Sequence, residues 1–255
     1  MACLTVLGSC GAWPEPGRAC SGYVLEHAGF RLVLDLGYGT ATRLLAHVGS
    51  RSGDGVDAVV ISHEHPDHML DLHALFRARW FGHREGPPIS LYAPPGVMAV
   101  LADLEDDEGA LEHVFTHHPL PSGGYDVGPF RLESRLLPHF VPNVGVRLTA
   151  PGLTVAYTGD TGPDPAVREL ARNADLMIAE ATDRSQQKDS PPATSANLHL
   201  SARQAGVAAA AAGARRLLLT HFWPGNDRDR SRTDARDVFD GEVLLAEEGL
   251  AVALP

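Results

Sequence analysis

The amino-acid sequence predicts an α/β fold in which two sheets carry helices on their outer faces. Short apolar runs typical of buried strands alternate with segments of helical period, and this alternation occurs in two halves of the chain. The 255 residues are 44% hydrophobic and 21% charged, which suffices for a sizeable core within the size range of one domain. We therefore expect a single domain that spans residues 1–255.

The apolar patterns place each element along the chain. Strands are predicted over Leu4–Leu7, Tyr23–Glu26, Arg31–Leu36, Ala58–Ile61, Ile89–Tyr92, Phe130–Leu137, Val144–Thr149, Leu153–Tyr157, Leu176–Ala179, Leu217–Thr220, Val243–Ala246 and Leu250–Ala253. Helices are predicted over Ala41–Val48, Asp67–Trp80, Val97–Leu104, Pro165–Arg172, Ala202–Gly213 and Thr233–Phe239. The charge-rich runs 103–108 and 226–232 are interpreted as solvated loops. The polar, Pro-rich run 184–197 is predicted to be a loop, either a lid or a solvated connector.

Composition excludes several classes of protein. The formal net charge is -11, opposite to the basic surface expected of a nucleic-acid binder. Cys3, Cys10 and Cys20 are an odd number without metal-ligand companions, which argues against a disulfide framework. The Ala-rich run 205–214 is too short for a membrane span, and the first residues lack the pattern of a signal peptide. We expect a cytoplasmic protein without a membrane partner, and long nucleic acid is disfavoured.

The run His63-Glu64-His65-Pro66-Asp67-His68 carries the chemistry of the chain. It follows a predicted strand and opens a predicted helix, so the motif lies on a strand-to-helix turn. Residues two apart point the same way in an extended turn, so His63 and His65 can hold one metal ion. Asp67 and His68, at the start of the helix, can hold a second ion. The motif therefore predicts half of a two-metal hydrolase site.

The remaining ligands are expected at the ends of later strands. His139, Asp160 and His221 each follow an apolar run. A carboxylate has two oxygens and can bridge two cations, so Asp160 is the natural shared ligand. This set closes a dinuclear site made of seven residues: His63, His65, Asp67, His68, His139, Asp160 and His221.

This ordered series resembles the metallo-β-lactamase superfamily. The pattern comprises HxHxDH, a lone His, Gly-Asp-Thr and Thr-His, and the Leu34-Asp35-Leu36-Gly37 turn extends it toward the N-terminus. The resemblance implies a four-layer αββα sandwich with two divalent metal ions at one edge between the sheets, and it implies that Asp35 supports the ligands. Zinc suits the His and carboxylate donors, while manganese or iron is also compatible with them. Gly37-Tyr38-Gly39 lacks a dinucleotide fingerprint, so no nucleotide cofactor is expected.

Two further residues, Glu180 and His199, suggest the branch of the superfamily. Together with Gly-Asp-Thr and Thr-His, the sequences Glu-Ala-Thr and His-Leu-Ser around them are similar to the phosphodiesterase branch that includes ribonuclease Z. That endonuclease usually carries a long tRNA-gripping arm between the lone His and the Gly-Asp-Thr, whereas only twenty residues separate His139 from Asp160 here. The armless pattern resembles actinobacterial cyclic-nucleotide phosphodiesterases of this fold.

The resemblance implies hydrolysis of 3′,5′-cyclic AMP to a 5′-nucleotide. A metal-bridging hydroxide would attack phosphorus, with Asp67 both a ligand and part of the catalytic set, while His199, oriented by Glu180, would assist the departing 3′ oxygen. Three alternatives stay open: a ribonuclease Z-like RNA-processing nuclease, a thioester or lactone hydrolase, and a non-catalytic metal-binding module. The expected partner is a small phosphodiester, and a homodimer is compatible with the sequence.

Overall fold

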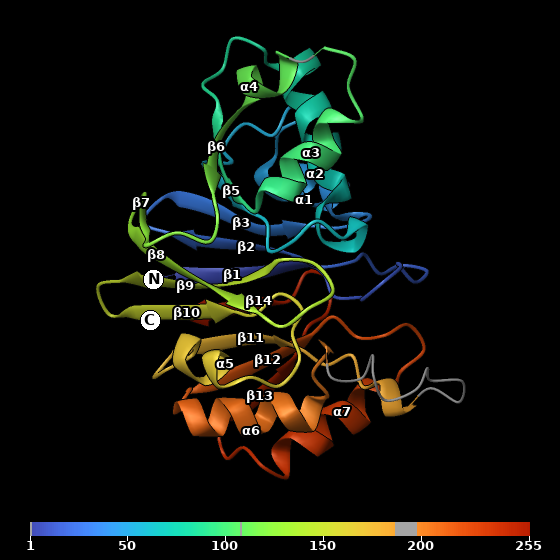
Figure 1. Cartoon of the computed structure of the whole chain (residues 1–255), viewed down its shortest axis with the longest axis vertical. Coiled ribbons are helices and arrows are strands. Elements are labelled where there is room, and N and C mark those ends of the chain that lie inside the picture. The colour runs from blue at the N-terminus through green and yellow to red at the C-terminus, as the bar shows by residue number, and fades with distance from the viewer. Residues whose placement is uncertain (1, 108, 187–197) are drawn as a thin grey trace.

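Two mixed sheets form the centre of the computed structural model, which describes residues 2–107, 109–186 and 198–255. Figure 1 shows the sheets stacked face to face, with the two ends of the chain close together. The first sheet has seven strands in the order β14 (Ala251–Leu254), β1 (Ala2–Gly8), β2 (Gly22–His27), β3 (Phe30–Leu36), β4 (Ala58–Val60), β5 (Ile89–Ala93) and β6 (Phe115–Pro119). The second has the order β13 (Glu242–Leu245), β12 (Arg216–Thr220), β11 (Leu176–Glu180), β10 (Leu153–Tyr157), β9 (Asn143–Ala150), β8 (Phe130–Leu137) and β7 (Tyr125–Val127).

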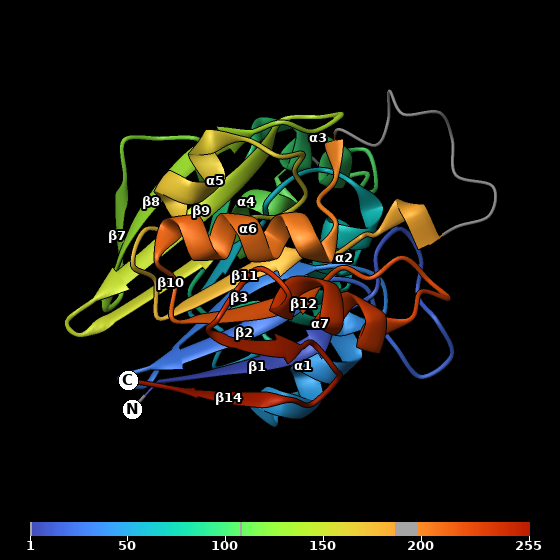
Figure 2. The same ribbon diagram turned by 90° about the horizontal axis from the view of Figure 1, so that it is seen from below.

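Helices cover the outer face of each sheet, as Figures 1 and 2 show. The first sheet carries α1 (Thr40–Val48), α2 (Pro66–Gly82), α3 (Pro95–Ala102) and α4 (Ala110–Val114), and the second carries α5 (Pro165–Leu170), α6 (Ala202–Ala212) and α7 (Arg228–Arg236). One buried apolar cluster fills the space between the sheets, and a further cluster lies under each helical layer. The predicted four-layer αββα sandwich is therefore confirmed, whereas the boundaries 1–255 for one domain stay a prediction.

Strand direction explains why the candidate ligands meet. In the second sheet β8 pairs antiparallel with β9, β9 pairs antiparallel with β10, and β10 to β13 are parallel. Strands β8, β10, β11 and β12 consequently run in one direction and end at one edge. In the first sheet, β3 and β4 are parallel and deliver the HxHxDH turn to the same region. Polar residues placed just after these strands are thereby brought together, although they are far apart in sequence.

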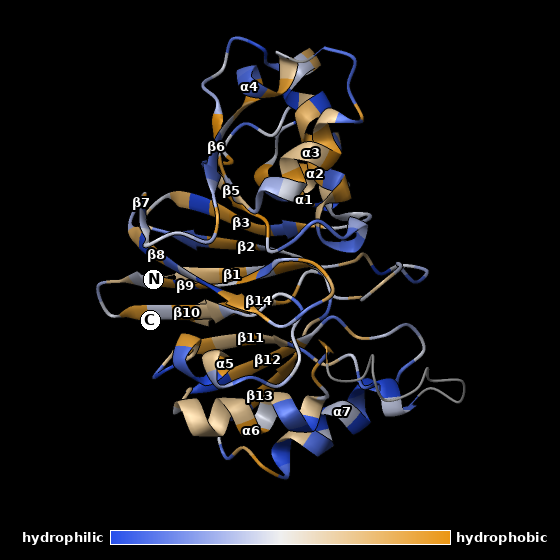
Figure 3. Ribbon diagram, viewed as in Figure 1, coloured by the Kyte–Doolittle hydropathy of each residue, from blue (hydrophilic) through white to orange (hydrophobic). Residues whose placement is uncertain are grey.

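The structure corrects several predicted elements. Strands β6 and β7 and helix α4 were not expected, because they are short and β6 has the polar sequence Phe-Thr-His-His-Pro. Helix α7 begins at Arg228, not Thr233, so the run 226–232 is mostly helix and not a solvated loop. The side chain of Asp227 caps this helix by accepting from the Arg230 amide. Figure 3 shows α7 as largely hydrophilic, which hid its helical period. Among the described residues, no helix has the length and apolar character needed to cross a membrane.

Candidate metal centre

The HxHxDH turn is built by the end of β4 and the start of α2. His65 is the extended N-cap residue of α2, with φ -67° and ψ 141°, and Pro66 takes the first helical position, where its missing amide is not needed. Asp67 lies in the first turn of the helix, where the helix dipole favours a carboxylate. The backbone of Gly37 passes so close to Asp67 that a Cβ there would lie 1.8 Å from the Asp67 carbonyl oxygen. Only glycine fits at this contact.

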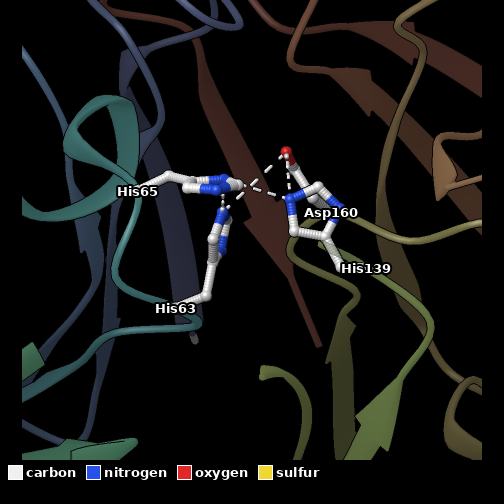
Figure 4. Close-up of side chains that lie close together, drawn as sticks. All are labelled: His63, His65, His139 and Asp160. Carbon is white, nitrogen blue, oxygen red and sulfur yellow. Dashed lines mark hydrogen bonds and ion pairs between the residues drawn. The ribbon is translucent and has the colours of Figure 1, made fainter. Parts of the chain in front are cut away.

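Four side chains gather into a first group of potential ligands: His63, His65, His139 and Asp160. Figure 4 shows their polar ends pointing toward one another. His65 Nδ1 lies 3.0 Å from His63 Nε2 and 3.1 Å from His139 Nε2. Asp160 Oδ2 lies 3.7 Å from His139 Nε2 and 4.0 Å from His63 Nε2. Three nitrogens and one oxygen thus enclose a common space.

Asp67, His68 and His221 form a second group next to the first. His221 Nε2 lies 3.2 Å from Asp67 Oδ2, and His68 Nε2 lies 3.6 Å from the same oxygen. Asp160 joins this group as well, because its Oδ1 lies 3.2 Å from His68 Nε2 and its Oδ2 lies 3.3 Å from His221 Nε2. The structure therefore brings all seven sequence-predicted ligands together, with Asp160 between the two groups.

Asp35 sets the orientation of two histidines from behind. Its Oδ2 accepts hydrogen bonds from His68 Nδ1 at 2.7 Å, Tyr157 OH at 2.6 Å and Ser62 Oγ at 2.8 Å. Since Ser62 Oγ gives its proton to Asp35, it accepts from His63 Nδ1 at 3.0 Å. In both neutral imidazoles the proton is then on Nδ1 and the lone pair on Nε2 faces the centre.

Glu180 plays the same part on the opposite side. Its Oε2 accepts from Thr182 Oγ1, so this hydroxyl accepts in turn from His221 Nδ1 at 3.0 Å. The same carboxylate accepts from His199 Nδ1 at 2.9 Å, and its Oε1 accepts from the Thr161 amide at 2.5 Å. His139 Nδ1 donates to the Leu198 carbonyl at 3.2 Å. The neutral imidazoles of His139 and His221 therefore also present Nε2 lone pairs.

This arrangement fits a metal centre. In the first group, His65 Nδ1 lies about 3 Å from His63 Nε2 and from His139 Nε2, close to the roughly 3.3 Å that separates two nitrogens on a tetrahedral zinc ion. His68 Nε2 and Asp160 Oδ1 are buried and make no hydrogen bond to any described residue, although they lie only 3.2 Å apart. Buried polar atoms without partners are costly, and a cation satisfies both.

Electrostatics favour positive charge at the same place. Burial, followed by the nearby His68, lowers the pKa of His63 well below its ordinary value, which keeps this imidazole in the neutral form that binds metals. Burial also lowers the pKa of His68, but the carboxylates of Asp160 and Asp67 outweigh burial and raise it well above the usual value. The carboxylates thus stabilise a positive charge at His68 Nε2, and a bound cation supplies that charge as a proton does.

Comparison with known proteins identifies the family. A family model described as "Beta-lactamase superfamily domain" matches residues 20–222. The chain belongs to the β-lactamase superfamily. Its fold and its relatives, described next, make it a metal-dependent hydrolase of the ribonuclease Z-like branch, and the sequence-based recognition is confirmed.

Three relatives place this hydrolase within the superfamily. An uncharacterised protein of Mycobacterium tuberculosis is 35% identical over 94% of this chain and 88% of its own length. "Probable metallo-hydrolase YhfI" of Bacillus subtilis is 31% identical over 96% of this chain and 97% of its own. The crystal structure of YhfI covers 99% of this chain and all of its own with a TM-score of 0.86. Ribonuclease Z of Halorubrum lacusprofundi is 28% identical over 99% of this chain and 97% of its own, in an alignment of 314 residues that includes insertions in that enzyme.

Sequence reasoning missed two parts of the hydrolase site. The sequence indicates Thr182 only as the last residue of the Glu-Ala-Thr motif, yet its hydroxyl connects Glu180 with His221, and its place two residues after Glu180 is the available signal. The loop after β1 was assigned no role, yet the Ala12 amide donates to Asp67 Oδ2 at 2.7 Å. No motif in residues 9–21 indicates this contact, because every residue except proline has a backbone amide, whatever its side chain.

Proposed function

We propose that this hydrolase cleaves 3′,5′-cyclic nucleotides, 3′,5′-cyclic AMP first among them, to 5′-nucleotides. The observation that carries the proposal is the pair of His199 and Glu180 beside the seven-donor centre, in a chain that has only a short hairpin between His139 and Asp160. A proton donor next to a two-metal centre suits a phosphodiester with an alkoxide leaving group. The short hairpin suits a small substrate.

The donor set divides between two divalent ions. His63, His65 and His139 would hold one ion, and Asp67, His68 and His221 the other, with Asp160 bridging them. Zinc suits this nitrogen and oxygen set, and manganese or iron is an acceptable substitute. When bound, the metals supply charge neutralisation on the phosphoryl oxygens and an activated water as nucleophile.

His199 is placed to protonate the leaving oxygen. Burial lowers the pKa of His199, but the carboxylate of Glu180 outweighs burial and raises this pKa to about 9, so the imidazolium form is favoured at neutral pH. Positive charge at the metal positions opposes this rise and moves the pKa toward neutrality, where a proton donor works best. His199 Nδ1 donates to Glu180 Oε2 at 2.9 Å, which leaves Nε2 to face the substrate. Glu180 acts as the positioning residue.

The hairpin and the surface charge support a small substrate. Strands β9 and β10 and a tight turn at Gly152 account for most of the segment between His139 and Asp160, every residue of which is described. This segment offers no arm that could grip a tRNA. The formal net charge of -11 repels a polyanion far more than a cyclic nucleotide, which carries a single phosphate charge.

Hydrolysis of 3′,5′-cyclic AMP by metal-loaded protein tests the proposal. Bis(p-nitrophenyl) phosphate and a tRNA precursor serve as comparison substrates, and chelated protein serves as the control. We expect chelator-sensitive conversion of cyclic AMP to 5′-AMP without cleavage of the tRNA precursor. Turnover of the generic diester alone would reject the substrate while preserving the metal-site chemistry.

A ribonuclease Z-like activity is the second candidate, favoured by the likeness to the Halorubrum enzyme. It needs a surface that attracts RNA, and therefore a steep loss of affinity with rising salt. Specific cleavage of the tRNA precursor with such a salt dependence would replace the first proposal. A weak cleavage that is independent of the precursor's structure would not.

A further inference from the structure

Exposed aromatic side chains lie beside the metal centre. Trp13 is 47% exposed, and its ring meets the half-buried ring of Trp223 edge-on, with centroids 5.1 Å apart and planes at 82°. The guanidinium of Arg184 lies 4.5 Å from the centroid of the Trp223 ring. We call Trp13, Trp223 and Arg184 the tryptophan cluster. An exposed tryptophan whose ring packs against a second, half-buried ring leaves a large apolar surface in water, which commonly marks a binding site.

The backbone ties this cluster to the proposed ligands. Trp223 is two residues beyond His221, and the Gly11 amide donates to the Phe222 carbonyl at 2.9 Å. Gly11 runs so close to the His221 ring that a Cβ there would lie 2.6 Å from it. The Ala12 amide donates to Asp67 Oδ2 at 2.7 Å. The loop that carries Trp13 is therefore held against both Asp67 and His221.

Strain in this loop points to a use for its conformation. Ala12 has φ 59°, in the left-handed region that is unfavourable for a residue other than glycine. Such conformations persist where surrounding contacts determine them, and they gather at ligand-binding positions. From the 2.7 Å contact and one further peptide unit, the Trp13 Cα lies within about 8 Å of Asp67 Oδ2. A nucleoside whose phosphate occupies the centre spans that interval.

The ring of His199 connects the cluster with the side where the leaving group departs. It stacks on the ring of His221 with centroids 5.9 Å apart, and Trp223 is two residues beyond His221. His199 is the residue assigned to the leaving 3′ oxygen, and the ribose that carries the base includes that oxygen. A nucleobase attached to this ribose consequently lies within reach of the tryptophan cluster.

We propose that Trp13 is a specificity residue that stacks the nucleobase of the substrate, with its ring held in place by Trp223, over which Arg184 lies. This proposal rests on the proposed function, because it assumes that the phosphodiester belongs to a nucleotide. Every base has a π-face, so stacking on an indole recognises nucleobases as a class. Loss of one stacked base corresponds to about a 5- to 150-fold loss of affinity.

The first test compares Trp13→Ala, Trp13→Phe and wild type with 3′,5′-cyclic AMP. We expect Trp13→Ala to raise KM about 5- to 150-fold with kcat nearly unchanged, and Trp13→Phe to restore most of the loss. Phe81→Ala is the matched control, because Phe81 is 70% exposed on α2 and lies about 21 Å along that helix from Asp67. Thermal unfolding of each variant verifies that the fold is retained.

The second test measures equilibrium binding and needs no turnover. Calorimetry on metal-loaded protein compares 5′-AMP with ribose 5-phosphate, which has the same phosphate and sugar but no base. We expect wild type and Phe81→Ala to prefer 5′-AMP, and Trp13→Ala to bind the two ligands equally. Equal binding by wild type would overturn the proposal, as would an undiminished preference in Trp13→Ala.

The two tests separate the stacking proposal from the proposed function. If wild type does not hydrolyse cyclic AMP but prefers 5′-AMP, and Trp13→Ala lacks that preference, the proposed function is wrong and the nucleobase site stands. If wild type hydrolyses cyclic AMP and Trp13→Ala keeps both the KM and the preference, the stacking role is wrong. Phe140, 55% exposed with its ring 6.0 Å from that of His199, is the competing position. An effect of Phe140→Ala alone would place the base there and refute the role of Trp13.

Discussion

Thr182→Val removes one hydroxyl group from a fully buried position beside the metal centre. That hydroxyl donates to Glu180 Oε2 and accepts from His221 Nδ1 at 3.0 Å. Valine fills nearly the same volume, so the substitution tests hydrogen bonding with little change in packing. It leaves the Nδ1 proton of His221 without its acceptor. No hydrogen bond then selects the neutral tautomer that presents the Nε2 lone pair to the centre.

The size of the effect follows from the lost contacts. Removal of a partner that orients a metal-binding histidine typically lowers metal affinity 10- to 100-fold. That range equals about 1.4 to 2.7 kcal/mol, similar to the roughly 1.5 to 3 kcal/mol assigned to one hydrogen bond with a charged group. The loss should fall on the ion held with His221, because His63 and His139 in the other group have orienting partners of their own.

Competitive titration of metal-free protein with zinc and a chromophoric chelator measures this change. We expect Thr182→Val to weaken one binding event 10- to 100-fold and to leave the other close to its wild-type value. Thr182→Ser, which retains the hydroxyl, is the control and should bind both ions almost as wild type does. Wild-type affinity at both positions in Thr182→Val would refute the tautomer argument, and equal weakening at both would refute the assignment of His221 to one ion.

Four further predictions concern the same centre. His199→Ala should retain both metals and lower kcat about 10²- to 10⁴-fold, most with poor leaving groups, whereas Asp160→Ala should lose metal bridging and turnover. Metal analysis, together with rates measured on diesters with graded leaving groups, checks both variants. Normal turnover in both would contradict the mechanism. Asp35→Asn should lower the free energy of unfolding by about 3 to 5 kcal/mol in urea titrations, because it removes a buried charge that accepts from His68 and Tyr157. Unchanged stability would show that these bonds are not needed. Chelation should lower the melting temperature of wild type more than that of Asp160→Ala, and equal shifts would disconnect the metal from stability.

The sequence predicted which of these side chains lie together, because most of them follow the ends of strands. His63, His139, Asp160 and His221 each follow an apolar run, and strands that share a direction bring their ends to one edge. The spacing within HxHxDH was also sufficient to predict where its side chains lie, since Pro66 fixes where the helix begins. Order along the chain and residue type therefore specified the side chains that converge.

Contacts made by backbone atoms and by short polar elements could not be predicted from the sequence. The Ala12 amide reaches Asp67 through a left-handed residue that has no glycine or asparagine to announce it. Helix α7 consists largely of charged residues, and its start depends on Arg228, which is buried and donates to Ser9 Oγ and the Ala246 carbonyl. Tertiary contacts select such conformations, so local composition does not indicate them.

In this hydrolase, the net charge of the whole chain and the charge expected at the metal-bound centre have opposite signs. The whole chain carries a formal net charge of -11, but the centre combines imidazoles with the carboxylates of Asp67 and Asp160, so two divalent ions would leave it locally positive. Interactions beyond about 8 Å are largely screened at physiological salt, so a small monoanion that enters the centre encounters mainly the positive charge. A long polyanion keeps many phosphates outside the centre, where the acidic surface repels each one. The proposed preference for small phosphodiesters would thus follow from how charge is distributed, without a residue that rejects RNA.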